Sequence, residues 1–397
     1  MDEVKQAIRD IQHFGEEGGV IPVIDVASTS TFLDPEDMEK VFRGELEGRY
    51  LYSRHSNPTG VDFGKKLAAL EEMEDAVGVA SGMAAISCSL LQLVPNGGHI
   101  VCSQTIYGGT YALLKNIFPR MGIAVTFVDP NDVRAFEKAI RPETKVLYTE
   151  TVSNPLLGIS DLKAIGALAK KRGLKLVVDN TFTPAVVTPS RYGADVVIHS
   201  CTKYISGASD LVAGAIISSK DFIHQLVDLN GGMAMLLGPV MDSRISHKLY
   251  LRLDHLPLRM TAHSRSAGYL AVKMEEAGVK VIYPGLKSHP QHELMKSMMH
   301  PEYGFGGMIT VDCGTREKAF RLASRLQEEK FGLYAVSLGF SRTLMSCPAV
   351  STSSEIPAED QEKMHLSPGL LRLSIGFTGN DKVMSERFFK CYHEVFG

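Results

Sequence analysis

Short apolar runs alternate with helical patterns through the middle of the chain, from about residue 62 to residue 250. The runs AVGVA, GHIVCS, AVTFVD, KVLYTE, LKLVVDN and DVVIHS have the length and composition of buried strands. Between them lie segments with helical spacing, such as SDLKAIGALAKKRG, which has a Ser/Asp start and a Gly stop. Buried strands that alternate with helices predict a mostly parallel sheet covered by helices on both faces.

The two ends of the chain have different patterns. After a charged helical segment at the N-terminus, residues 20–60 show no regular period and contain Pro22 and Pro58, which indicates an irregular arm. A long helical segment near 241–278 is followed by short strands at GGMITVDCG and GLLRLSIGF, which indicates a smaller α+β unit. We therefore expect an arm over 1–60, a large α/β domain over 61–255 and a C-terminal α+β domain over 256–397.

Composition excludes several classes of protein. The chain has 397 residues and a net charge of −3, so we expect neither nucleic acid nor a membrane surface as a partner. Its six cysteines are widely spaced without a CxxC pair, which fits free thiols in a reducing cytoplasm and no zinc site. The stretch from Ala76 to Leu114 lacks charged side chains, but Asn96-Gly97-Gly98 and several serines divide it into short elements. We expect a cytoplasmic protein without a bound metal.

Two groups of polar residues follow predicted strands and could bind an anion or a cation. Ser81-Gly82-Met83 opens an apolar helix directly after AVGVA. Backbone N–H groups at such a helix start can bind a phosphate, although an ordinary strand-to-helix turn has the same sequence. Asp179 ends the strand KLVVD, and a carboxylate there is unfavourable unless it is paired. It could cap a helix, form a salt bridge or pair with a protonated ring nitrogen.

Two further residues at strand ends could act on a flat, reactive ligand. Lys203, with Ser200 and Thr202, follows DVVIHS. It is either a solvated loop lysine or a buried amine with a lowered pKa, suited to Schiff-base formation. Tyr107 follows GHIVCS and could stack on a planar ligand or pack in the core.

Together these residues describe one type of pocket. The carboxyl ends of neighbouring parallel strands meet at one edge of a sheet, where ligands bind. Asp179 lies on the strand preceding Lys203, so both side chains are expected at that edge. A phosphate site, a carboxylate, a stacking ring and an amine fit pyridoxal phosphate.

The chain resembles the Cys/Met-metabolism family of pyridoxal-phosphate enzymes over nearly its whole length. The segments that carry the resemblance are STSTF, YSRHSNPT, SGMAAI, YGGTY, ETVSNP, VVDNTF, GADVVIHSCTKYISGASDLVAGA, VSLG and RLSIG. IYPGLKSHPQHELMK, YGFGGM and TLMSCPAVSTSSEI look most like the methionine γ-lyase branch. The resemblance implies the fold type I architecture of these enzymes, with a mostly parallel seven-stranded sheet in the large cofactor-binding domain and a C-terminal α+β domain.

The resemblance also implies a role for individual residues. Lys203 and Tyr107 would be catalytic, with Lys203 bound covalently to the cofactor and Tyr107 stacked on its ring. Asp179 would pair with the pyridine nitrogen. The remaining cofactor-binding residues would be Gly82, Met83, Asn154, Thr181, Ser200 and Thr202 from one subunit and Tyr52 and Arg54 from its neighbour. The substrate would be bound by Arg372, Ser337, Asn154 and Tyr52.

The implied reaction is α,γ-elimination of L-methionine, or of relatives such as homocysteine, to a thiol, 2-oxobutanoate and ammonia. Cystathionine γ-lyase, O-acetylhomoserine sulfhydrylase and cystathionine γ-synthase activities are alternatives within the family, and a non-catalytic cofactor-binding regulatory protein is a remote one. Many bacterial methionine γ-lyases have a cysteine where this chain has Gly109, which leaves substrate preference open. The arm would form a subunit interface, and the family's usual assembly is a homotetramer of two active-site-sharing dimers.

Overall fold

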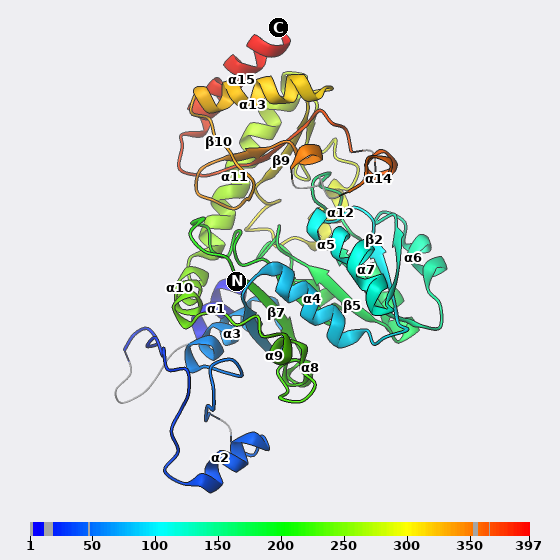
Figure 1. Cartoon of the computed structure of the whole chain (residues 1–397). Helices are drawn as coiled ribbons and strands as arrows, with labels where there is room; N and C mark the ends of the chain where they lie inside the picture. Colours follow the sequence, from blue (N-terminus) through cyan, green and yellow to red (C-terminus); the bar gives the residue numbers. More distant parts are fainter. Residues whose placement is uncertain (1–2, 12–18, 47, 352–355, 365) are drawn as a thin grey trace.

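The computed structural model describes residues 3–11, 19–46, 48–351, 356–364 and 366–397. It contains a seven-stranded sheet and a five-stranded sheet, linked by the long helix α11 (Leu256–Glu276) (Figure 1). Among the described residues, no helix is long and apolar enough to cross a bilayer.

The larger sheet has the order β1-β7-β6-β5-β4-β2-β3 and is mostly parallel, as predicted. Only β7 runs antiparallel to its neighbours, β1 and β6. This strand was not among the six predicted runs, since the segment that follows Lys203 is rich in glycine and serine before it reaches GAIIS. The strands are β1 (Asp75–Val79), β2 (His99–Ser103), β3 (Ala124–Val128), β4 (Thr144–Glu150), β5 (Lys175–Asp179), β6 (Val196–His199) and β7 (Gly214–Ser218).

Both faces of this sheet are buried, which explains why its strands are apolar without alternation. Neighbouring residues of β5 illustrate this, because Val177 and Val178 are both fully buried but belong to two separate cores. The helices of this part of the chain are α3 (Pro58–Glu71), α4 (Gly82–Leu93), α5 (Gly108–Ala112), α6 (Val133–Ala139), α7 (Leu162–Arg172), α8 (Lys220–Leu226), α9 (Met233–Leu237) and α10 (Ser243–Leu253), with short π or 3₁₀ turns at Leu113–Ile117, Phe118–Met121 and Pro189–Tyr192.

Helix α7 begins and ends where its sequence predicts. The side chain of Asp161 accepts a hydrogen bond from the N–H of Ala164 and caps the first turn. Gly173 follows the last turn with a φ of 64°, a left-handed conformation that glycine adopts without steric cost. Local sequence therefore fixes the connection that leads into β5.

The smaller sheet has the order β10-β11-β12-β9-β8. Leu371 and Leu373 of β12 pack with the helices of the C-terminal core, so the alternation of a strand turns Arg372 to the opposite face. The elements are β8 (Val281–Ile282), β9 (Met308–Asp312), β10 (Leu333–Tyr334), β11 (Leu344–Ser346), β12 (Leu370–Ser374), α12 (His292–Met298), α13 (Arg316–Glu328), α14 (Ala358–Lys363), α15 (Asp381–Phe396) and a 3₁₀ turn at Pro348–Val350.

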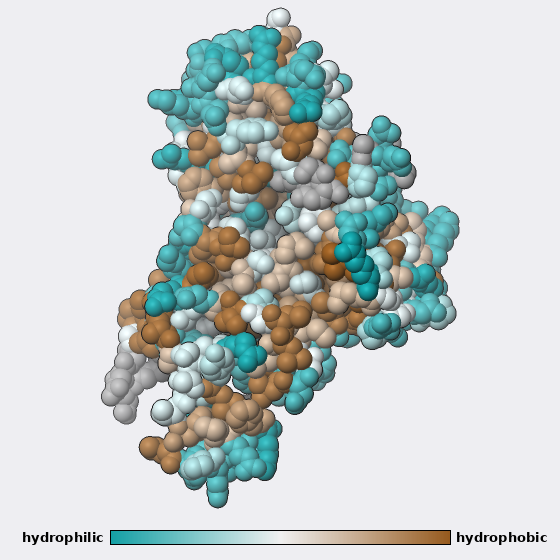
Figure 2. Space-filling view, in the orientation of Figure 1, coloured by the Kyte–Doolittle hydropathy of each residue, from teal (hydrophilic) through white to brown (hydrophobic). Residues whose placement is uncertain are grey.

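The described part of the N-terminal region, which includes α1 (Glu3–Asp10), extends away from the body of the molecule after residue 19 (Figure 1). Helix α2 (Pro35–Phe42) lies at the far end of this arm. Many apolar side chains of the arm are exposed, including Val20, Val23, Val26 and Leu33, and Leu33 is 108% exposed. Figure 2 shows apolar surface over the arm and the neighbouring part of the body. Such a surface is unusual for a monomer.

Candidate active site

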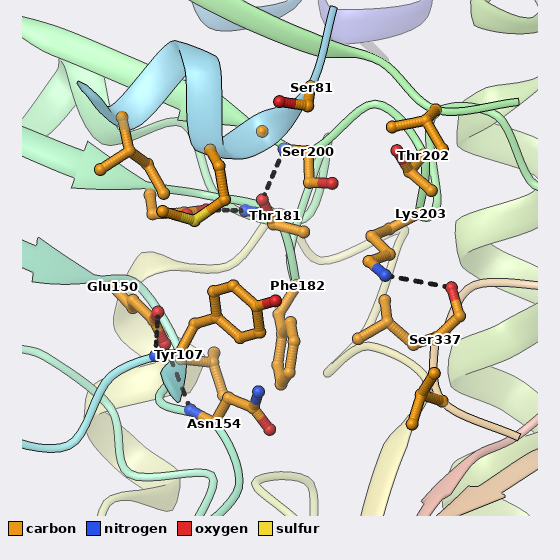
Figure 3. Close-up of a pocket in the computed structure, with 18 of the residues that line it drawn as sticks. Ser81, Tyr107, Glu150, Asn154, Thr181, Phe182, Ser200, Thr202, Lys203 and Ser337 are labelled. Carbon is orange, nitrogen blue, oxygen red and sulfur yellow. Dashed lines mark hydrogen bonds between the residues drawn. The ribbon is translucent and has the colours of Figure 1, made fainter. Parts of the chain in front are cut away.

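A cavity of about 330 Å³ lies where strands of the larger sheet end, and it is closed on the far side by residues of the C-terminal part (Figure 3). Asp179 ends β5, Ser200 follows β6, Gly82 begins α4, and Arg372 comes from β12. Of the predicted site residues, the cavity lining contains Gly82, Met83, Tyr107, Asn154, Asp179, Thr181, Ser200, Thr202, Lys203, Ser337 and Arg372.

Lys203 is not a solvated surface lysine. Its side chain points into the cavity, and Nζ donates a hydrogen bond to Ser337 Oγ at 3.1 Å (Figure 3). Burial, together with the positive charge of Arg372, lowers the pKa of Lys203 to about 8. A larger fraction of this amine is therefore neutral and nucleophilic at neutral pH than for an ordinary lysine.

Two carboxyl groups lie side by side at the strand ends. Asp179 on β5 is in register with Glu150 on β4, and both line the cavity. Burial raises the pKa of Asp179, and burial together with the charge of Asp179 raises the pKa of Glu150 well above its usual range. Asp179 Oδ1 also accepts the N–H of Thr181 at 2.9 Å. A cationic ring nitrogen would pair with the Asp179 carboxylate and compensate for its burial.

Glu150 was not among the predicted site residues, although its place at a strand end resembles that of Asp179. KVLYTE ends in a carboxylate in the same way as KLVVD, and both strands end at the same edge of the sheet.

The start of α4 approaches the end of β6 closely enough for both to contact one ligand. A Cβ on Gly82 would lie 2.7 Å from Cβ of Ser200, so only glycine allows this separation. The Ser81 side chain accepts the N–H of Ala84, and the N–H groups of Gly82 and Met83 have no partner within the helix. With the hydroxyls of Ser200 and Thr202 in the same cavity lining, these donors fit a phosphate dianion.

Arg372 is almost completely buried, at 2% exposure, which excludes an exposed arginine at a strand edge. Its Nη1 donates to Asn154 Oδ1 at 3.0 Å, and its Nη2 donates to the backbone oxygen of Ser337 at 3.3 Å. Burial lowers the pKa of Arg372 to about 10. Ser337 has a φ of 123°, a strained conformation for a residue with a side chain, and such strain is concentrated at functional sites. The guanidinium is suited to an anionic ligand such as a carboxylate.

Tyr107 directly precedes α5, and its ring points into the cavity beside Phe182 (Figure 3). A Cβ on residue 109 would lie 2.6 Å from Cε1 of this ring, so the glycine at that position permits the observed ring placement.

Tyr52 and Arg54 do not line the cavity of their own chain. Arg54 Nη1 donates to the backbone oxygen of Met235 at 3.1 Å, and Tyr52 is 47% exposed at the base of the arm. The fold of one chain therefore leaves these two predicted site residues apart from the others.

The donor set as a whole fits pyridoxal phosphate. It offers a phosphate site at α4, the Asp179 carboxylate for the ring nitrogen, an aromatic ring and a buried amine of low pKa. Comparison with known proteins agrees with this chemistry. Residues 6–386 match the family described as "Cys/Met metabolism PLP-dependent enzyme".

Individual relatives match almost end to end. The methionine γ-lyase of Arabidopsis thaliana is 45% identical over 393 residues, which cover 97% of this chain and 89% of that protein. The cystathionine γ-lyase of Bacillus subtilis is 37% identical over 375 residues, 94% of each chain. A Campylobacter jejuni structure described as an O-acetylhomoserine (thiol)-lyase, with N'-pyridoxyl-lysine-5'-monophosphate, superimposes with a TM-score of 0.90. It is 27% identical and the match covers 99% of this chain and 100% of that one.

Proposed function

The chain belongs to the Cys/Met-metabolism family of pyridoxal-phosphate-dependent enzymes, and on that premise we propose that it is a methionine γ-lyase. It eliminates the γ-thiol of L-methionine, or of related amino acids such as homocysteine, and releases a thiol, 2-oxobutanoate and ammonia. The observation that carries this proposal is that the low-pKa amine of Lys203 and the buried guanidinium of Arg372 both donate hydrogen bonds to Ser337. Ser337 accepts from Lys203 Nζ through its hydroxyl and from Arg372 through its carbonyl.

Residues of one chain would hold most of the cofactor. Gly82, Met83, Ser200 and Thr202 would bind its phosphate, Asp179 its ring nitrogen and Tyr107 its ring face, with Asn154 and Thr181 beside it. Bound at Lys203, pyridoxal phosphate supplies an electron sink for the bonds that break next to the substrate's α-carbon.

The protein's own groups orient the substrate and move its protons. Arg372, with Asn154 and Ser337, holds the amino acid's carboxylate and so presents the α-carbon towards Lys203. Nζ of Lys203 removes the α-proton as a neutral amine, for which a pKa of about 8 is well suited. Loss of a β-proton then provides the electron pair that expels the γ-sulfur, and the hydroxyl of Tyr107 gives a proton to the departing sulfur.

A second candidate reaction within the family is cystathionine γ-lysis, or γ-replacement on O-acetylhomoserine as in a sulfhydrylase or cystathionine γ-synthase. The similarity to the Bacillus and Campylobacter proteins favours it. The remote alternative, a non-catalytic regulatory protein, does not explain why Lys203, Asp179 and Arg372 converge on one cavity.

The proposed assembly is a homotetramer of two active-site-sharing dimers in the cytoplasm. Residues 1–60 form the interface arm, 61–255 the cofactor-binding domain and 256–397 the C-terminal domain, although residues 1–2, 12–18 and 47 of the arm lie outside the described part of the chain. The exposed apolar side chains of the arm support this assembly, as does the separation of Tyr52 and Arg54 from their own chain's cavity. The six buried free cysteines are compatible with a reducing compartment.

Two measurements on the purified protein test the proposal. Borohydride should attach the cofactor covalently to Lys203, located by mass spectrometry of the peptide. Release of 2-oxobutanoate should then be compared for methionine, homocysteine and cystathionine, and thioether formation for O-acetylhomoserine with a thiol. A higher rate of 2-oxobutanoate release from methionine or homocysteine than from cystathionine supports methionine γ-lyase activity. Absence of bound cofactor would refute the whole proposal, and a preference for cystathionine or for γ-replacement would favour the second candidate.

A further inference from the structure

Glu150 is a buried carboxyl group in the cavity wall that the proposed chemistry does not use. It ends β4 and is 6% exposed. Its backbone is held firmly, since its carbonyl oxygen accepts the Ser160 hydroxyl at 2.7 Å and its strand pairs with β5 at Asp179. A second carboxyl next to Asp179 in a buried site is unfavourable unless its contacts compensate for the cost.

The two carboxyl oxygens of Glu150 bind two different loops. Oε1 accepts the backbone N–H of Tyr107 at 2.7 Å, and Oε2 accepts the backbone N–H of Asn154 at 3.2 Å (Figure 3). Asn154 in turn accepts from Arg372 Nη1 through its side chain at 3.0 Å. One carboxyl thus connects the backbone of Tyr107 with the backbone of Asn154, whose side chain binds the Arg372 guanidinium.

From these contacts we propose that Glu150 is a positioning residue that keeps the Tyr107 ring and the Asn154–Arg372 pair in a fixed mutual arrangement. The inference rests on the proposed function, because it assigns the ring to the cofactor and the guanidinium to the substrate carboxylate. In this role Glu150 touches neither the cofactor nor the substrate. It acts through the backbone N–H groups of Tyr107 and Asn154, from which its carboxyl oxygens accept hydrogen bonds.

Only glutamate meets both requirements at this position. Glutamine has nearly the same shape but a single acceptor oxygen, so its NH₂ group would face one of the two N–H donors and leave that donor unpaired. Aspartate keeps both oxygens but is shorter by one methylene, so it cannot reach both loops from the same backbone position.

The test compares Glu150→Gln with Glu143→Gln. Glu143 lies just before the opposite end of the same strand and is exposed, and its carboxylate lies 3.8 Å from Arg141 Nε. Both variants should retain the cofactor through Lys203. We expect Glu150→Gln to change the visible circular dichroism of the bound cofactor, because the ring beside it moves, and to lower kcat/KM by about 10- to 100-fold. Part of this loss should be a higher KM, because Arg372 is less well placed. Glu143→Gln should match the wild type in all three quantities.

A purely structural role predicts a different result. It would lower the melting temperature of the apoprotein while leaving the dichroism, KM and kcat of the folded enzyme unchanged, and that result would overturn the inference. If Glu150→Gln does not fold, Glu150→Asp provides the same comparison, with the same two outcomes.

A double-variant cycle isolates the route through Asn154. In an Asn154→Ala background, Glu150→Gln should raise KM by several-fold less than it does in the wild type, since the connection to Arg372 is already broken. An equal rise in both backgrounds would contradict that route. Failure of the proposed function is distinguishable from these results, because the wild-type protein would then bind no pyridoxal phosphate and show no dichroism to compare.

Discussion

A single lysine illustrates how much of this site depends on its surroundings. Lys203 has an ordinary sequence context for a loop, but its Nζ lies against Ser337 Oγ, near the buried charge of Arg372. Both effects favour the neutral amine: burial removes the water that stabilises the ammonium, and the guanidinium repels it. The chemistry of the residue is therefore set by side chains that are distant in the sequence.

This environment gives a prediction about pH. Only the neutral amine of Lys203 attacks an aldehyde, so the rate at which the apoprotein takes up pyridoxal phosphate should rise with pH and level off near the pKa of about 8. Below that value the rate should rise about tenfold per pH unit, since the neutral fraction does. Stopped-flow absorbance between pH 6 and pH 10 measures this profile.

Arg372→Met supplies the matched control for the pH profile. Removing the cation should move the plateau to higher pH, because one of the two effects that lower the pKa of Lys203 is lost. A wild-type rate that still rises about tenfold per pH unit between pH 9 and pH 10 would mean that this lysine has an ordinary pKa.

The close approach of α4 to the end of β6 brings the phosphate donors together. Gly82 is the contact point, because its missing side chain leaves room for Ser200 Cβ. The cap at Ser81 fixes the start of the helix, so the N–H groups of its first turn have a defined direction. Two elements that are far apart in the sequence thus form one anion site.

We predict that Gly82→Ala weakens binding of pyridoxal phosphate by about tenfold or more. The added methyl group would force α4 and the Ser200 segment apart and lengthen the bonds to phosphate. Equilibrium titration of the apoprotein, followed by absorbance, gives the dissociation constant.

Gly60→Ala serves as the control for this substitution. It adds the same methyl group within α3, where no atom lies within 4 Å of the new Cβ, and should leave affinity unchanged. Equal affinity of Gly82→Ala and wild type would show that the phosphate lies elsewhere.

The surface of the arm supports the proposed assembly. The arm exposes apolar side chains, and Tyr52 and Arg54 lie at its base, outside the cavity, where Arg54 contacts α9. A symmetric dimer in which each arm covers the partner would bury this surface. It would also bring a second set of these residues to each site, as the proposed assembly requires.

Mixing two inactive variants tests whether subunits share an active site. Lys203→Ala and Arg54→Ala should each be inactive. After the two variants are refolded together, about half of the dimers are hybrids, and each hybrid has one complete site out of two. About a quarter of all sites should therefore have both residues intact. The measured quantity is 2-oxobutanoate release relative to wild type.

Mixing Lys203→Ala with Asp179→Asn is the control. Both residues line the same cavity of one chain, so no hybrid contains a complete site and activity should not return. If the Lys203→Ala and Arg54→Ala mixture also stays inactive although hybrids form, each subunit has its own complete site.

The sequence by itself determined six of the seven strands of the large sheet and the helices between them, their mostly parallel direction, the family, and the placement of Asp179 and Lys203 at one edge. The strands, the helices and the shared edge follow from hydrophobic period, caps and strand ends, which are local properties, whereas the family follows from the segments that the chain shares with it. Only the tertiary structure decided that Arg372 binds Asn154, 218 residues away, and that Lys203 contacts Ser337, 134 residues away. It also gave Glu150 its two partners and left Tyr52 and Arg54 outside. No local pattern encodes such contacts, because they depend on how the two sheets pack against each other.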